Sequence, residues 1–551
     1  MKRRKWKHAC VSDTVDGFIK EKTGKSIEEL TKWTGKAFKR FDEVKTVLLV
    51  AAKTKRPVYL VGDYDSDGIN STMIMTLLFV TMGLKYNLII PKREAEGYGL
   101  SQKIIDRIPD GVILVTVDNG ISAVEQMKNA KSRGMYTIIL DHHTAGDEIP
   151  DVDILIDPSA VGEADYTNYC GAGISYRLAE YILGENHPLV SVLSVFAAIG
   201  TIGDVVELTG DNRQIVIEGM KNMKAGIGTK AIQSLLEQAK FSESSTSTDI
   251  AFNIVPALNA PERLEDGGAA KVCQVLLRSK NFDEGICWLM EQNQKRKDIV
   301  ERIMKNVDLD EYRKNDERII FLKRDDIPLG VAGIIAGKLS EGTGKPSFVY
   351  GYDAEKNLKG SARCSLKEVN IIDLIRENKN LLLGCGGHAG AAGLSLKIEN
   401  YDQFKTAMED SLNKRLAVLA SEGIVQEFET EEYTKWDVCA NDLNFSATAK
   451  KILSLEPVGE GIPAPKIRIK TRLVKVQPFG GPKDAPEKDK PHIRFNLAGF
   501  SAIGFNMNEW YQEQLKLVKY PRFVDIVGTV MENIYQGNKS IQIKMDDFEL
   551  S

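Results

Sequence analysis

Short apolar runs alternate with amphipathic stretches over the first 220 residues of this 551-residue chain. Residues 57–61, 112–115 and 136–140 are rich in Val, Ile and Leu and have the length of buried strands. The first two runs are followed by stretches with helical spacing, residues 71–82 and 122–133. Strands that alternate with helices predict a parallel α/β sheet, in which binding sites lie at the carboxyl ends of the strands.

After residue 220 the pattern of hydrophobic and polar positions no longer predicts one continuous parallel sheet. Residues 282–306 form one long, charged helical segment that could connect two domains, and residues 318–322 and 331–339 predict a strand and a helix of a second α/β unit. Beyond about residue 450, short alternating strands predict a small β-barrel, with a mobile loop at 480–490. The predicted parts are an N-terminal helical segment at 1–45, a parallel-sheet α/β domain at 46–220, a helical continuation with the connecting helix at 221–310, a second α/β domain at 311–425 and a β-barrel domain at 426–551.

Each of four polar clusters directly follows a short apolar run. They are Gly-Asp-Tyr-Asp-Ser-Asp-Gly at 62–68, Val-Asp-Asn-Gly at 117–120, Asp-His-His at 141–143 and Gly-Asp-Val-Val at 203–206. The chain has six histidines, and two of them are adjacent in the third cluster. A single aspartate in such a place is more often the N-cap of the next helix. Four clusters at four strand ends are hard to explain by capping, so we expect a metal site.

The first cluster also resembles the start of a calcium-binding EF-hand loop, because it reads Asp-x-Asp-x-Asp-Gly. Such a loop needs a bidentate Glu at its twelfth position, which is Ile74 when counted from Asp63. An EF-hand loop also follows a helix, whereas a strand is predicted here. The EF-hand interpretation is therefore rejected.

The clusters supply the oxygen and imidazole ligands that hard divalent cations accept, and Mn²⁺ tolerates both kinds. Five residues would suffice for two ions that share one carboxylate: Asp65, Asp67, Asp118, His142 and Asp204. Two such ions activate water and stabilise the leaving oxygen in phosphoryl displacement.

The bulk composition is that of an ordinary globular protein, with 43% hydrophobic and 27% charged residues. No apolar run reaches the roughly 18 residues of a membrane span, and the basic N-terminus lacks the apolar stretch of a secretory signal. Seven scattered cysteines favour reduced thiols in a cytoplasm. The net charge of −4 means that any contact with nucleic acid must come from a local basic surface.

In this order the four clusters resemble the successive motifs of the DHH phosphoesterase superfamily. Gly386-Gly-His-Ala-Gly-Ala-Ala-Gly393 resembles the glycine-rich motif of the associated DHHA1 domain. The segments at 91–100, 170–173, 208–213 and 455–461 are similar to bacterial RecJ, so the resemblance covers nearly the whole chain. It implies a DHH domain, a DHHA1-like domain, a C-terminal OB-fold and a single-stranded-DNA-specific 5′-to-3′ exonuclease that uses two Mn²⁺ or Mg²⁺ ions, in DNA repair and recombination.

The resemblance also implies roles for individual residues. Asp65, Asp67, Asp118, His142 and Asp204 become the expected metal ligands, with Asp118 bridging. Asp63 and His143 are expected to be ligands or to support the nucleophile and the phosphate, two roles that the sequence does not separate. A monomer in the cytoplasm is expected, with single-stranded DNA as substrate, a helicase or single-strand-binding protein as possible partners, and no membrane.

Two further segments could contact phosphates. Closely spaced glycines let backbone N–H groups approach a phosphate, so Gly386, Gly387, His388 and the guanidinium of Arg363 are candidate phosphate ligands. Tight packing of a helix on a sheet is the competing explanation for the glycines. In the C-terminal domain a strand through Lys466, Arg468, Lys470 and Arg472 would present one basic face, suited to single strands or simply solvated.

Some positions depart from the RecJ pattern. Ala257 replaces an arginine, Pro261 and Glu262 replace Ala-Gly, and Ile327-Pro328 replaces Trp-His, which affects the expected DNA path more than the metal site. Two other functions stay open: a phosphodiesterase for short oligonucleotides or cyclic dinucleotides, and a non-catalytic single-stranded-DNA-binding scaffold. A pyrophosphatase would leave the C-terminal barrel unexplained.

Overall fold

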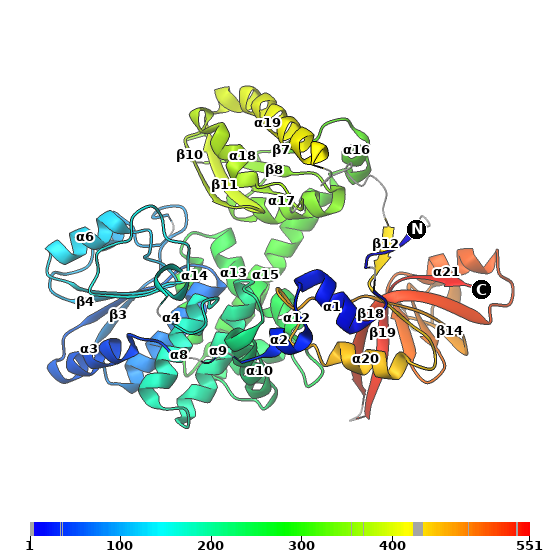
Figure 1. The fold of residues 1–551 in the computed structure, drawn as a ribbon, viewed down its shortest axis with the longest axis horizontal. Helices are drawn as coiled ribbons and strands as arrows, with labels where there is room; N and C mark the ends of the chain where they lie inside the picture. The colour runs from blue at the N-terminus through cyan, green and yellow to red at the C-terminus, as the bar shows by residue number, and fades with distance from the viewer. Residues whose placement is uncertain are drawn as a thin grey trace. The chain divides into compact units, whose positions relative to one another are not determined.

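The structure, a computed structural model, describes residues 5–551 except 11, 34, 36, 98, 163, 354, 367, 423–432, 483 and 536–537. The chain divides into two units. Figure 1 labels helices and strands of both. The first unit combines Met1–Asn259, Ala269–Cys287 and Tyr433–Ser551, and the second combines Ala260–Gly268 with Trp288–Glu432. Part of the predicted mobile loop, Lys483, and the predicted domain boundary at 425/426 lie outside the described residues.

A five-stranded parallel sheet in the first unit carries the clusters. Its strand order is β3-β2-β4-β5-β6, with β2 Val58–Val61, β3 Tyr86–Ile89, β4 Ile113–Val117, β5 Tyr136–Leu140 and β6 Ile154–Ile156. All five residues of β4 are buried, because helices cover both faces of a parallel sheet, and this explains the continuous apolar runs. The three predicted strands are confirmed.

Helices of the first unit surround this sheet and continue beyond it. They are α3 Phe41–Thr54, α4 Ser66–Thr81, α5 Gln102–Ile105, α6 Val124–Ser132, α7 Pro158–Val161, α8 Gly171–Leu183, α9 Pro188–Gly203, α10 Gly210–Lys224, α11 Lys230–Gln238 and α12 Ser247–Asp249. A short π-helix, Ile250–Ile254, leads into α13 Val255–Leu264, and α14 Gly268–Leu276 follows. The helices predicted at 71–82 and 122–133 correspond to α4 and α6.

The fourth cluster does not follow a strand as predicted. Asp204 is the C-cap of α9, and its backbone N–H donates to the carbonyl of Gly200 at 2.9 Å. The apolar run before it is helical because α9 is buried along most of its length, and a helix that is apolar all round has no alternation to distinguish it from a buried strand.

The segment predicted as an N-terminal helical part begins with a strand. β1 Lys5–His8 pairs in parallel with β12 Tyr433–Trp436, and α1 Val15–Thr23 and α2 Ile27–Thr31 follow. Four residues are too short for their periodicity to be read from sequence, and the pairing partner lies more than 400 residues away.

The C-terminal part of the first unit is a seven-stranded sheet of order β13-β14-β18-β19-β17-β16-β15. The strands are β13 Val438–Ala440, β14 Ile467–Arg472, β15 Lys475–Phe479, β16 His492–Asn496, β17 Ser501–Gly504, β18 Phe523–Tyr535 and β19 Asn538–Leu550. Two helices accompany it, α20 Phe445–Leu453 and α21 Asn508–Leu515. Strands were predicted correctly here, but β18 and β19 have 13 residues each and are not short. No strand pairing among the described residues closes the sheet between β15 and β13.

Arg213 joins this sheet domain to the helices of the parallel-sheet domain. Its guanidinium donates to the carbonyls of Leu455, Glu456 and Pro457 at 2.8–3.0 Å and is almost fully buried. Ser247 adds a bond of 2.7 Å to the carbonyl of Val458. Polar contacts between segments far apart in sequence therefore hold the C-terminal sheet against the helices of the parallel-sheet domain.

The second unit is also α/β. Its five-stranded sheet has the order β10-β11-β9-β8-β7, with β7 Ile320–Lys323, β8 Ser347–Tyr352, β9 Leu358–Arg363, β10 Gly384–His388 and β11 Ala391–Leu396. Its helices are α16 Leu309–Lys314, α17 Leu329–Thr343, α18 Ile371–Glu377 and α19 Tyr401–Ser421. The long helix α15 Phe282–Lys305 runs from the first unit into the second, as the charged segment predicted.

Candidate metal centre

The first cluster forms a tight turn between β2 and α4. Asp65 is the N-cap of α4, and its Oδ1 accepts hydrogen bonds from the N–H groups of Asp67 at 2.9 Å and Gly68 at 3.1 Å. A Cβ on Gly68 would lie 2.6 Å from the carbonyl carbon of Asp63, so only glycine fits there. The turn places three carboxylates within five residues, and Asp65 combines the capping function with its place in the cluster.

Asp67 is buried and oriented by the start of α8. Its Oδ2 accepts from the N–H of Gly171 at 2.7 Å, and its Oδ1 accepts from the N–H of Ala172 at 2.9 Å. The first N–H groups of a helix have no partner within the helix, so a carboxylate is stabilised there. No pattern in the sequence predicts this contact, because the partners are backbone groups about a hundred residues away.

Close packing brings the helices to the site. A Cβ on Gly171 would lie 2.6 Å from the Cβ of Asp118, and a Cβ on Gly200 would lie 2.4 Å from the Cβ of Ala172. These two glycines therefore allow α8 to approach Asp118 and α9 to approach α8.

His142 lies among the carboxylates of three different segments. Its Nε2 is 3.2 Å from Oδ1 of Asp118, 3.6 Å from Oδ2 of Asp204 and 3.8 Å from Oδ2 of Asp67. The carboxyl ends of β4 and β5 and the end of α9 thus meet at one point. The side chain of His142 is largely buried, and burial lowers its pKa, an effect to which the neighbouring His143 adds.

Asp141 positions the two histidines. Its Oδ1 accepts from the backbone N–H groups of His142 at 2.8 Å and His143 at 3.3 Å and lies 2.7 Å from Nδ1 of His143. Burial alone would lower the pKa of His143, but the hydrogen bond and the charge of Asp141 raise it to about 9. The sequence identified this residue only as part of a motif, and its positioning role required the structure.

The side chains form overlapping groups suited to metal ions. Ligand atoms of Asp63, Asp65 and Asp118 lie within 4.8 Å of one another, as do those of Asp67, His142 and Asp204. A third group joins Asp118, His142 and His143 and so connects the other two. All seven candidate residues predicted from the clusters therefore gather at one edge of the parallel sheet.

The electrostatics of the site fit a cation. Burial and neighbouring carboxylates raise the pKa of Asp63, Asp65 and Asp118, and burial and the charges of Asp67 and Asp65 raise the pKa of Asp204 to about 8. The buried Oδ1 of Asp63 and Nε2 of His142 have no hydrogen-bond partner among the residues that the structure describes. Crowded carboxylates and unsatisfied ligand atoms are what a centre for divalent cations requires.

The other residues expected to bind phosphate lie on neighbouring strands of the second unit. Arg363 on β9 and His388 on β10 both pair with Ala391 of the intervening strand β11. Their side chains therefore face the same side of the sheet, and their Cα atoms are two strand spacings, roughly 10 Å, apart across it. Gly387 has φ 144, and a Cβ there would lie 2.4 Å from the carbonyl oxygen of Ala391. A Cβ on Gly386 would meet no atom, so tight packing explains only one of these two glycines.

The predicted basic face of β14 is present but partly neutralised. Arg468, Lys470 and Arg472 alternate with the buried Ile469 and Thr471. Arg468 pairs with Asp525 at 2.7 Å, and Lys466, just before the strand, pairs with Asp546 at 2.8 Å.

Three family models match successive parts of the chain. The DHH family, N-terminal domain, matches residues 57–201, the DHHA1 domain matches residues 316–414, and the RecJ OB domain matches residues 437–547. Each match contains the corresponding group of candidate residues except for Asp204, which lies three residues beyond the first. Among the described residues, no helix has the length and apolar character needed to cross a membrane.

Curated relatives extend the similarity to most of the chain. The single-stranded-DNA-specific exonuclease RecJ of Bacillus subtilis is 29% identical over 516 residues, which cover 91% of this chain and 62% of the relative. RecJ of Haemophilus influenzae is 27% identical and covers 92% of this chain and 90% of the relative. The chain thus spans less than two thirds of the first of these proteins.

Solved structures share the fold. RecJ from Thermus thermophilus in complex with Mn²⁺ superimposes with a TM-score of 0.75 at 23% identity and covers 97% of this chain and 75% of that protein. An exonuclease RecJ bound to manganese gives a TM-score of 0.60 at 27% identity, covering 68% of this chain and 94% of that one.

Proposed function

We propose that the chain, in which the DHH, DHHA1 and RecJ OB family models match in succession, is a metal-dependent exonuclease of the RecJ kind. Its substrate is single-stranded DNA, which it hydrolyses from the 5′ end to mononucleotides. The observation that carries the proposal is the convergence of His142 with Asp67, Asp118 and Asp204 within 3.2–3.8 Å.

The centre would hold two Mn²⁺ or Mg²⁺ ions. Asp63, Asp65 and Asp118 would hold one ion, Asp67, His142 and Asp204 would hold the other, and Asp118 would be the carboxylate available to both. Divalent ions in such a pair supply an activated water and offset the charge on the leaving oxygen. The protein's own part is to fix the carboxylates, through the start of α8 for Asp67 and through Asp141 for the histidines.

His143 keeps its proton at neutral pH, since its pKa is about 9, and can donate a hydrogen bond to a phosphate oxygen. Arg363 and His388 on the exposed part of the second sheet would bind a further phosphate of the strand, with Gly386 and Gly387 beside them. Lys470 and Arg472 on β14 would contact the strand backbone.

The setting of this activity belongs to the same proposal. We propose a monomer that works in the cytoplasm in DNA repair and recombination, on strands that a helicase or a single-strand-binding protein makes available.

The test is Mn²⁺-dependent digestion of single-stranded DNA labelled at the 5′ or the 3′ end, with duplex DNA and the Asp118→Ala variant alongside. Early release of the 5′ label, absent for duplex and for the variant, is expected. Loss of the shared ligand should reduce cleavage by more than the roughly 10–100-fold typical of residues that only support a ligand. The variant should still bind single strands.

Two other results would overturn the proposal. An inert long strand with rapid turnover of dinucleotides would assign the chain to the phosphodiesterases of short substrates. Binding of single strands without cleavage, equal in both proteins, would make it a scaffold.

A further inference from the structure

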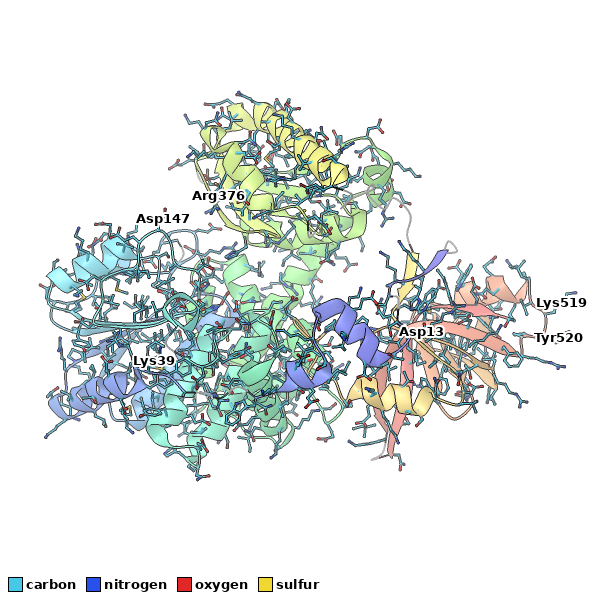
Figure 2. All side chains as sticks on the ribbon, in the orientation of Figure 1. Asp13, Lys39, Asp147, Arg376, Lys519 and Tyr520 are labelled. Carbon is cyan, nitrogen blue, oxygen red and sulfur yellow. The ribbon has the colours of Figure 1, made fainter. Side chains whose placement is uncertain are left out.

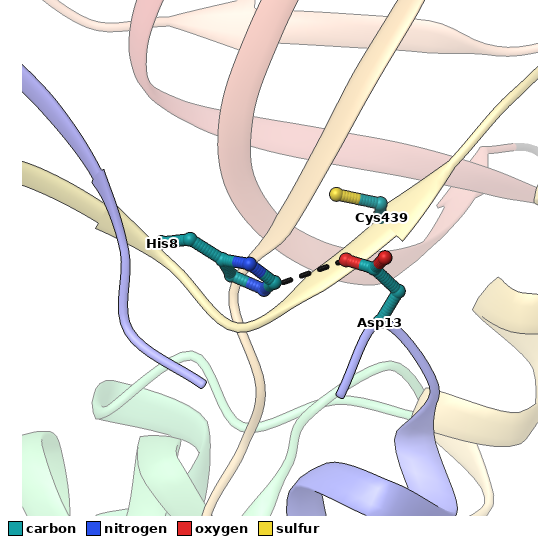
Figure 3. A group of neighbouring side chains, drawn as sticks. All are labelled: His8, Asp13 and Cys439. Atoms are coloured by element: carbon teal, nitrogen blue, oxygen red, sulfur yellow. Dashed lines mark ion pairs between the residues drawn. The ribbon is translucent and has the colours of Figure 1, made fainter. Parts of the chain in front are cut away.

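A second group of metal-ligating side chains lies outside the candidate centre. His8 ends β1, Asp13 precedes α1 and Cys439 is on β13, and their ligand atoms lie within 4.8 Å of one another (Figure 3). Asp13 lies between α1 and the C-terminal sheet (Figure 2). The group therefore joins the beginning of the chain to the C-terminal domain, and all of it belongs to the first unit.

Two distances at this group, both measured from Nε2 of His8, suit tetrahedral coordination. Nε2 of His8 lies 3.5 Å from Oδ1 of Asp13 and 3.2 Å from the carbonyl oxygen of Asp437. Nitrogen and oxygen ligands at about 2.0 Å from a tetrahedral ion lie roughly 3.3 Å from each other. The Asp437 carbonyl can therefore complete a set of four donors with the imidazole, the carboxylate and the thiol.

Secondary structure holds these donors in place. His8 is paired with Trp436 in the parallel β1–β12 ladder, and its ring stacks on that indole with centroids 5.3 Å apart and planes at 7°. The N–H of Cys439 donates to the carbonyl of Asp13 at 3.3 Å. The His8 ring is thus fixed by stacking, and the backbones that carry Asp13 and Cys439 are held together by a hydrogen bond, which lowers the cost of ordering a coordination shell.

Arg468 is a cation that lies near the group of His8, Asp13 and Cys439. The guanidinium of Arg468 lies 4.6 Å from the ring centroid of Trp436, on which His8 also stacks. Its charge is offset by Asp525 at 2.7 Å, so it does not prevent an ion from binding. The carboxylate of Asp13 and a thiolate of Cys439 would bring two negative charges to the ion.

We propose that His8, Asp13, Cys439 and the carbonyl of Asp437 bind a zinc ion that fastens the N-terminal strand to the C-terminal domain. A thiolate with an imidazole favours Zn²⁺ over the oxygen-preferring Mg²⁺ and Mn²⁺. The ion has a structural role, because the donors connect β1, the turn before α1 and β13. The site is independent of the proposed nuclease activity.

The test uses the full chain loaded with Co²⁺ and compares wild type with Cys439→Ser. A cobalt–thiolate bond gives a charge-transfer absorption band in the near ultraviolet, which the carboxylates and imidazoles of the other centre do not produce. The band is expected in wild type and absent in Cys439→Ser, whereas Cys385→Ser, which removes an exposed thiol of the second unit, should keep it.

A second variant covers the case in which Cys439→Ser does not fold. Asp13 has a side chain that is 64% exposed, so Asp13→Asn should fold and should weaken Zn²⁺ binding by more than about tenfold, measured by competition with a chelator. Chelation should lower the melting temperature of wild type by more than that of Cys439→Ser, in which only the ions of the other centre are removed. Cleavage of short single strands in Mn²⁺ should be unchanged in both variants, which separates this site from the proposed nuclease activity.

Absence of the band in wild type, or equal bands in wild type and Cys439→Ser, would overturn the proposal. The group would then be a hydrogen-bonded contact between β1 and the C-terminal domain without a metal. Zinc affinity unchanged in Asp13→Asn would lead to the same conclusion.

Discussion

The backbone of Asp118 adopts the left-handed conformation, with φ 59, directly after β4. A residue other than glycine costs of order 1–3 kcal/mol in this region, so the surrounding packing must hold it there. Gly171, on which a Cβ would lie 2.6 Å from the Cβ of Asp118, allows α8 to pack directly against this residue. The strain places the carboxylate beside His142 and is consistent with a functional centre.

At the same scale, the charge of Asp204 makes metal binding depend on pH. Its pKa of about 8 means that it carries a proton at pH 6–7, which a divalent ion must displace. We expect the affinity for Mn²⁺ to rise from pH 6 to pH 8, by at most about tenfold per pH unit for each proton released. Calorimetry in two buffers of different ionisation enthalpy measures the released protons.

An Asp204→Asn variant is the control for this prediction. It should release about one proton fewer on binding and show a shallower dependence on pH. An affinity for Mn²⁺ that is the same at pH 6 and pH 8 would contradict the prediction.

At the scale of elements, the start of α8 supports the metal centre. Gly171→Ala would place a methyl group against Asp118 and push the helix away from Asp67. We expect a loss of about 1–3 kcal/mol in the free energy of unfolding, together with weaker Mn²⁺ binding. Urea denaturation and metal titration would measure the two effects.

Gly337 is the matched control, because it lies inside α17 and a Cβ there meets no atom within 4 Å. Gly337→Ala should stabilise the protein by up to about 1 kcal/mol and leave metal binding unchanged. Equal behaviour of the two variants would mean that α8 does not support the centre.

The strand β14 gives a second prediction at this scale. Removing Lys470 and Arg472 together, as Lys470→Ala with Arg472→Ala, should weaken binding of single-stranded DNA. The slope of log affinity against log salt should fall by about 1.4 in magnitude, because each phosphate contact on a single strand contributes roughly 0.7. Fluorescence anisotropy at several salt concentrations measures the slope.

Lys488→Ala with Lys519→Ala removes the same charge from a different part of the C-terminal domain and should leave the slope unchanged. Arg468→Ala should have a smaller effect than either Lys470→Ala or Arg472→Ala, since Asp525 already neutralises this guanidinium. The same loss of slope in the control pair would point to a general effect of charge.

At the scale of the whole molecule, polar contacts bind the C-terminal sheet to the parallel-sheet domain within the first unit. Arg213→Ala would leave the carbonyls of Leu455, Glu456 and Pro457 without this donor and should cost roughly 3 kcal/mol or more. Calorimetry should show that the C-terminal part unfolds separately in the variant, and limited proteolysis should cut near these residues. A single unchanged transition would show that Arg213 does not couple the two parts.

The local pattern was enough to predict the strands of the parallel sheet, the long helix α15 and five of the acidic and histidine residues of the candidate centre, while the roles expected of Asp63 and His143 came from the family resemblance. These features could be predicted because a buried parallel strand needs an apolar run, and because parallel strands bring their carboxyl ends to one edge. Asp204 was identified as a candidate although the run before it is a helix.

Tertiary structure alone decided which groups position the ligands. The N–H groups of Gly171 and Ala172 hold Asp67, Asp141 orients His143, and β1 pairs with a strand that begins at residue 433. These contacts join residues distant in sequence or use backbone groups that every residue carries, so no local pattern of side chains predicts them. The partial neutralisation of the basic strand was hidden for the same reason, since Asp525 pairs with Arg468 only across the assembled sheet.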